Sequence, residues 1–114
     1  MSTTLYDSIP EDLRVFVQPP LDDSHLAERK YRLRITQEME HSRGIAWTGQ
    51  LMAGDTVVAV VENAGYGGAN DYVIKEHDSW GTFADDAYKA YGNNSQAKDS
   101  LIQFIDVMTT AKVS

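Results

Sequence analysis

The chain has 114 residues, with 17 acidic and 10 basic side chains, a formal charge of -7 and no cysteine. This length suits a single domain spanning residues 1–114, and the missing cysteines exclude disulfides and thiolate metal sites. No stretch is apolar enough for a membrane span and no signal peptide opens the chain, so we expect a cytoplasmic protein that does not bind membranes. Its negative charge also disfavours direct binding of nucleic acid.

The N-terminal segment carries signals for short helical turns only. Ser8 and Glu11 have the spacing of a capping box, which predicts a short helix over residues 10–14. Residues 22–24 offer a second cap, which predicts one further turn over residues 25–29.

Residues 30–40 alternate strictly, which is typical of a half-buried antiparallel strand. The face that we expect to be buried carries Tyr31, Leu33, Ile35, Gln37 and Met39. The opposite face carries Lys30, Arg32, Arg34, Thr36, Glu38 and Glu40.

Three further strands are predicted. Residues 45–52 alternate, and Gly54 can supply the positive φ of a hairpin turn before residues 56–62. The run TVVAVVE at 56–62 is β-branched on both faces and should be the most buried strand. It could equally pair across a homodimer. Residues 71–77 are a candidate fourth strand.

The C-terminal part predicts two helices. Residues 79–91 have apolar side chains at helical spacing, with Thr82 as the expected N-cap and Gly92 at the end. Ser95 is the expected cap of the last helix, in which an apolar stripe is formed by Leu101, Ile102, Ile105 and Met108. Strands followed by helices indicate an α+β fold, here a three- or four-stranded antiparallel meander with two C-terminal helices on one face. The expected parts are an irregular segment 1–29, a sheet 30–77 and helices 79–112.

A glycine-rich loop follows the apolar strand, where a phosphate-binding turn would lie. It lacks the lysine of a P-loop and the third glycine of a dinucleotide fingerprint, so we interpret it first as a wide turn. The alternative is a small-ligand site for a nucleotide or phosphate. That site would use Gly65, Tyr66, Gly67, Gly68, Asn70, Arg32 and Arg34.

Catalytic and metal-binding patterns are missing from the sequence. His25, His41 and His77 show no ligand spacing, and no serine lies in a nucleophile elbow. We therefore expect no metal, no cofactor and no enzymatic activity. A hydrolase that uses carboxylates with His77 is a third hypothesis, for which the sequence offers no geometry.

Negative charge is concentrated in the C-terminal part. Residues 44–114 hold nine acidic and four basic groups, a net charge of -5, against -2 for residues 1–43. We expect a partner with a basic surface to bind this helical side, with Tyr66 and Trp80 as exposed anchors. The acidic residues assigned to the partner surface are Asp78, Asp85, Asp86, Asp99 and Asp106.

Residues 48–72 resemble small bacterial and phage proteins of unassigned activity. The shared pattern is a strand, a turn, a second strand and the loop Asn-x-Gly-x-Gly-Gly-x-Asn-x-Tyr. Its residues here are Gly54, Asp55, Asn63, Gly65, Gly67, Gly68, Asn70 and Tyr72. The resemblance implies a shared fold and an origin in a mobile element. The first hypothesis is thus a protein that binds and inhibits a host protein, such as a nucleic-acid-handling component of bacterial defence.

Overall fold

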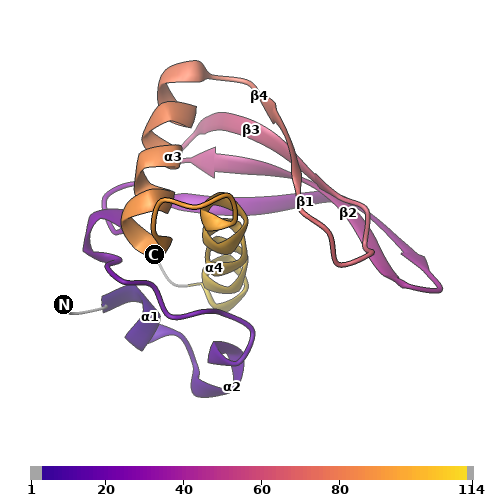
Figure 1. The fold of residues 1–114 in the computed structure, drawn as a ribbon, viewed down its shortest axis with the longest axis horizontal. Coiled ribbons are helices and arrows are strands. Elements are labelled where there is room, and N and C mark those ends of the chain that lie inside the picture. The colour runs from indigo at the N-terminus through magenta and orange to yellow at the C-terminus, as the bar shows by residue number, and fades with distance from the viewer. Residues whose placement is uncertain (1–3, 113–114) are drawn as a thin grey trace.

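The computed structural model describes residues 4–112. Its centre is one antiparallel sheet of four strands, in the order β1-β2-β3-β4 (Figure 1). Two C-terminal helices pack on one of its faces, which confirms the predicted α+β meander. The strands are β1 (Tyr31–His41), β2 (Gly44–Ala53), β3 (Thr56–Asn63) and β4 (Asp71–Ile74). The helices are α1 (Thr4–Ser8), α2 (Glu11–Arg14), the 3-10 turn η1 (Ser24–Leu26), α3 (His77–Tyr91) and α4 (Ala97–Ala111). Over the described residues, no helix has the length and apolar character that a membrane crossing requires.

The hydrophobic core lies between the two long helices and one end of the sheet. Phe83 from α3 and Phe104 from α4 are fully buried there, together with Leu51 and Val61 from the inner strands. Burial of each such side chain stabilises the fold by about 1.5–3 kcal/mol. The predicted apolar stripe of the last helix is confirmed in this core and consists of Leu101, Ile102, Ile105 and Met108.

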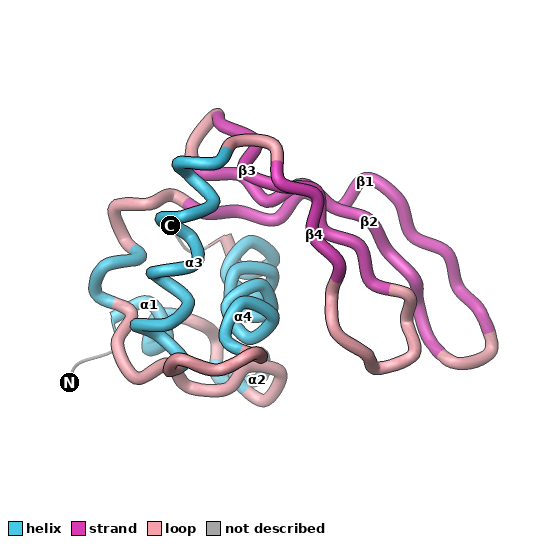
Figure 2. The backbone as a smooth tube through the Cα atoms, turned by 45° about the horizontal axis from the view of Figure 1, so that its top comes forward, coloured by secondary structure: helices cyan, strands magenta, loops and turns pink. Residues whose placement is uncertain are grey.

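The sheet is longer than the helical layer that covers it (Figure 2). Helices lie over the end that contains the start of β1, which we call the near end. The β1–β2 hairpin and the β3–β4 loop project beyond them, and we call this the far end (Figures 1 and 2).

A β-bulge in β1 separates these two ends. Ile35 pairs with Gly49 and Gln37 with Thr48, so Thr36 is an extra residue in β1. An extra residue shifts the alternation by one, and the side chains after it change faces. Gln37 and Met39 therefore lie on the outer face, away from the helices. The prediction that they continue the buried face of Leu33 is wrong, and Met39 is 70% exposed.

The predicted helix starts are wrong in detail. α3 begins at His77 because the Glu76 carboxylate accepts hydrogen bonds from the main-chain N–H groups of Asp78 (3.2 Å) and Ser79 (2.8 Å). These bonds also lower the pKa of Glu76. Thr82 is therefore inside the helix rather than its N-cap, and His77 is not in a strand.

The other two predicted caps also fail. Ser95 does not cap α4, whose N-cap residue is Gln96 and carries no side-chain cap bond. Ser8 ends α1, and Pro10 is the N-cap residue of α2.

The N-terminal segment is short-helical, as predicted, and packs into the core. Ile9 and Leu26 are buried. Asp23 is fully buried, and its carboxylate accepts a hydrogen bond from the Tyr6 main-chain N–H (2.8 Å). This segment is thus part of the domain.

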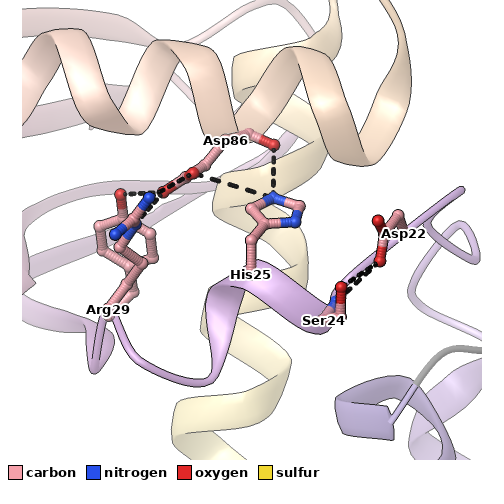
Figure 3. Close-up of polar contacts among 6 residues, drawn as sticks. Asp22, Ser24, His25, Arg29 and Asp86 are labelled. Carbon is pink, nitrogen blue, oxygen red and sulfur yellow. Dashed lines mark hydrogen bonds and ion pairs between the residues drawn. The ribbon is translucent and has the colours of Figure 1, made fainter.

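Asp86 is a fully buried carboxylate that joins this segment and β1 to α3 (Figure 3). Arg29 Nε donates to its Oδ2 (2.8 Å), as does the Tyr31 hydroxyl (2.7 Å). His25 Nε2 lies 3.2 Å from the Asp86 main-chain oxygen. Burial, and then the bond to Asp86, raise the pKa of Tyr31, so its hydroxyl stays protonated and donates.

The placement of Asp86 on a partner surface is therefore wrong. The residue lies one helical turn from the buried Phe83 and Ala90, so the helix directs it towards the core. Its neighbour Asp85 is exposed, as predicted.

Asp86→Ala is expected to lower the free energy of unfolding by about 3 kcal/mol, because it removes the acceptor of a buried ion pair. Asp85→Ala is the matched control and should change it by less than about 0.5 kcal/mol. Urea unfolding of both variants measures the difference. Equal, small effects would show that the buried carboxylate does not anchor the fold.

Candidate functional site

The β3–β4 loop packs directly against the β1–β2 hairpin at the far end. Gly65 has a φ of +82°, and a Cβ there would lie 2.7 Å from the Ile45 carbonyl carbon and 2.8 Å from the Ala46 nitrogen. Only glycine allows the loop backbone to come this close to the hairpin backbone in a left-handed conformation. Gly67 also has a positive φ, of 81°, whereas Gly68 has open space around it. The wide-turn interpretation thus accounts for two of these three glycines.

Polar side chains of the loop form one hydrogen-bonded chain that reaches α4. Asn63 Oδ1 accepts from the Gly65 N–H (2.8 Å), and Asn63 Nδ2 donates to Asn70 Oδ1 (2.8 Å). Asn70 Nδ2 is 3.4 Å from the Tyr72 hydroxyl, which donates to Asp99 Oδ1. Burial first, then the bond to Asp99, raises the pKa of Tyr72. The Asn, Gly and Tyr positions of the sequence pattern therefore hold the loop in place.

Hydrogen bonds of His41 fix the tip of the hairpin. Arg43 donates its main-chain N–H to His41 Nδ1 (3.2 Å), so that nitrogen carries no proton. His41 Nε2 then carries the proton and donates to the Ala64 carbonyl (2.9 Å). The His41 ring lies 4.8 Å from the Tyr66 ring, with the Arg43 guanidinium 5.5 Å from the same ring.

The two aromatic anchors predicted from the sequence differ in exposure. Tyr66 is 63% exposed, which confirms the prediction. Trp80 is partly buried against the core, where it packs 5.1 Å from the Tyr72 ring and 5.4 Å from the Phe83 ring. Its predicted exposure is therefore wrong, because α3 begins earlier than expected and places Trp80 on its core side.

Two carboxylates face each other on the outer face of the far end. Glu62 of β3 is directly opposite Asp71 of β4 in the register. Like charges in this position destabilise a sheet. Both residues line a hollow of about 320 Å³, which we call the far hollow. Its floor includes Met39, Ala46 and Thr48, all on the outer face by register.

A second acidic pair lies on the inner face of the same end. Asp106 of α4 is partly buried, and this burial raises its pKa, with a smaller contribution from the negative charge of Glu38. No cation compensates either pair, since the only ion pairs within residues 4–112 are those of Asp86 with Arg29 and with His25. The far end therefore presents four carboxylates in two repulsive pairs.

The proposed phosphate-binding residues are not brought together. Arg32 pairs with Met52 at the near end, whereas Gly65 packs on Ile45 at the far end. His41 is nine positions beyond Arg32 along β1, which corresponds to a distance of about 30 Å at the rise of a strand. Arg34 lies only two residues further along β1. The glycine loop therefore has no arginine from the near end beside it.

The remaining acidic residues lie on the helices. Asp78 and Asp85 are exposed on α3. Asp99 is partly buried and accepts from Tyr72. Only Asp106, of the five predicted, belongs to the far end.

The three histidines occupy separate positions in the structure. Across the part of the chain that is described, no three histidine or carboxylate side chains gather as they would around a metal ion. His25 bonds to Asp86, His41 fixes the hairpin tip and His77 is exposed at the start of α3. No protein-family model, curated protein or solved structure matches this chain.

The sequence contains no direct signal for the far-end carboxylates. Glu62 and Asp71 are nine residues apart, and only the strand register makes them neighbours. Glu38 belongs to β1 and Asp106 to α4, and the bulge at Thr36 decides which face Glu38 occupies.

Gly65→Ala is expected to lower the free energy of unfolding by about 2 kcal/mol, because the new methyl group meets main-chain atoms in a left-handed conformation. Gly68→Ala, the matched control, has open space and should change it by less than about 0.5 kcal/mol. Chemical denaturation of the two variants provides the comparison. A Gly65→Ala variant as stable as Gly68→Ala would refute the close packing of loop and hairpin.

Asp106→Asn is expected to stabilise the protein at neutral pH. The pKa of Asp106 is above its unfolded value in the folded state, so its ionised form costs stability once the pH exceeds the folded pKa. The cost fades as the pH falls through the folded pKa towards the unfolded value of 3.8. For a partly exposed group we expect a gain of about 0.5–1 kcal/mol at neutral pH and none near the unfolded pKa.

Unfolding measured across this pH range tests the sign. Glu38→Gln removes only the repulsion and should give a smaller gain, which is not additive with that of Asp106→Asn. A loss of stability in Asp106→Asn at neutral pH would contradict the burial of an unpaired carboxylate.

Proposed function

We propose that the protein is a non-enzymatic interaction module that binds a protein partner with a basic surface through the far end of its sheet. The proposal rests on two pairs of neighbouring carboxylates whose negative charge no cation compensates. They are Glu62 with Asp71 and Glu38 with Asp106. Their repulsion costs stability in the free protein. A lysine or arginine of a partner, placed between the two carboxylates, would remove that cost and contribute charge-assisted hydrogen bonds.

Exposed apolar side chains surround these charges. Met39 is 70% exposed, Tyr66 63% and Ile45 50%. A flexible methionine and a tyrosine held by neighbouring rings are suitable anchors for a protein interface, where a few apolar residues supply most of the affinity. The combination of apolar anchors with an acidic rim favours a protein over a bare cation as the ligand.

The surface is ordered before binding. The Asn63–Asn70–Tyr72–Asp99 chain holds the loop on α4, and the contact of Gly65 holds it on the hairpin. A preordered surface loses little conformational entropy on association, which increases affinity.

In its most concrete form, the proposal is an inhibitor of a nucleic-acid-handling bacterial defence protein, encoded by a phage or another mobile element. An acidic surface of this kind would occupy a basic groove that otherwise holds nucleic acid. The resemblance of residues 48–72 to small phage proteins supports this origin. The net charge of -7 supports a basic partner.

Affinity capture from bacterial extract tests the proposal with two variants of equal charge change. Glu62→Lys/Asp71→Lys alters the far end, and Asp78→Lys/Asp85→Lys alters exposed carboxylates of α3. We expect the wild-type chain and the α3 variant to retain the same basic protein, and the far-end variant to lose it by about tenfold or more. Circular dichroism confirms that both variants are folded.

Retention should also fall as salt concentration rises, since complementary charges are screened. Equal retention by all three proteins, or loss in the α3 variant alone, would overturn the assignment of the surface. The second of these outcomes would restore the helical side as the binding surface.

A further inference from the structure

A second hollow, of about 360 Å³, lies at the near end of the sheet, opposite to the end that carries the proposed partner surface. We propose that this near hollow binds a small ligand through a phosphate dianion. It is lined by Lys30, Arg32, Asp55 and Lys112, with Tyr31, Gly54 and Thr109 completing the wall. Its volume is within the range of small-molecule sites, which begins at about 300 Å³.

The charge of the near hollow is opposite to that of the protein. In a chain of net charge -7, the lining brings together three cations and one carboxylate, which leaves an excess of two positive charges. None of the three cations has an ion-pair partner among residues 4–112. The last carbonyl groups of α4 carry a partial negative charge at this end, of about half a charge, and do not cancel the excess. A phosphate dianion matches it.

The cations come from two segments of the chain, the start of β1 and the end of α4. Lys30 precedes β1, Arg32 is inside β1, and Lys112 follows α4. The two lysines are the only non-glycine residues with positive φ in the described part of the chain, at 54° and 58°. Main-chain bonds hold both conformations, from Gly54 N–H to the Lys30 carbonyl (3.1 Å) and from Lys112 N–H to the Thr109 carbonyl (3.1 Å). Lys112 is the left-handed C-cap of α4, a common way for a helix to end.

The uncharged groups of the wall are already occupied. The Tyr31 hydroxyl donates to Asp86, and the Thr109 hydroxyl donates to the Ile105 carbonyl while it accepts from the Leu33 N–H. Recognition therefore depends on the cations, with the forked guanidinium of Arg32 as the group best suited to phosphate oxygens.

Isothermal titration of the full chain tests the proposal with adenosine monophosphate, adenosine and inorganic phosphate. We expect binding of the monophosphate and none of adenosine. Inorganic phosphate that binds as tightly as the nucleotide would identify the free ion as the ligand, and weaker binding would identify a phosphorylated metabolite. Either result supports a phosphate site.

Arg32→Gln should weaken this binding by about tenfold or more, since it removes the forked donor. Arg34→Gln is the matched control: it makes the same change on the same face of β1, at a residue that does not line the hollow. Its affinity should stay within about twofold of wild type. Lys112→Gln provides a second loss variant, on another element.

Three results would overturn the proposal: no binding of any phosphate probe below about 10 mM, an unchanged affinity in Arg32→Gln, or an equal loss in Arg34→Gln. The last would indicate unspecific attraction to the basic half of β1. The titration is independent of the partner surface, so its failure leaves the proposed function standing.

Discussion

The buried carboxylate of Asp86 determines where the helices lie. It accepts from Arg29 and Tyr31, and so joins the N-terminal segment and the start of β1 to the middle of α3. A buried ion pair of this kind is satisfied in one arrangement only, because moving either partner leaves a charge without a counter-ion. The helical layer is therefore held over the near end, and the rest of the sheet extends beyond it without a cover (Figure 2).

Charge divides along the sheet in the same way. The near end carries Lys30, Arg32 and Arg34 with one carboxylate, Asp55, whereas the far end carries Glu38 and Glu62 with their acidic neighbours and one guanidinium, Arg43, at the hairpin tip. Basic and acidic residues on neighbouring strands could form ion pairs with each other. Within residues 4–112, however, the ion pairs are those of Asp86, and none joins two strands. Keeping like charges together costs stability, which is common where a surface is needed for binding. The two proposed sites follow from this division.

The spacing of apolar residues in the sequence predicts which side of a single strand or helix is buried. The alternation of residues 30–34 and the stripe of α4 are confirmed, because each reports which side of one element meets the core. The predicted burial of Ile35 is wrong, since this side chain is 37% exposed. The bulge at Thr36 was not predicted, since it depends on how β1 matches β2 across the hairpin. The start of α3 was misplaced because glutamate is an uncommon N-cap, so Glu76 carried no signal.

The candidate sites were harder to predict than the fold. Asp86 looked like a surface residue beside Asp85, although its helical spacing from Phe83 indicated burial. The glycine loop follows β3 as predicted, and its Asn63 and Asn70 are hydrogen-bonded to each other within the loop. The acidic pairs of the far end arise from strand register and from packing of α4. Neither can be read from spacing along the chain.

The most direct test of the far end as the binding surface is hydrogen–deuterium exchange of the protein alone and in complex with the captured basic partner. The account predicts slower exchange on binding in residues 37–48 and 61–71, and no change in α3. Slower exchange confined to α3 and the exposed side of α4, with the far end unchanged, would contradict it.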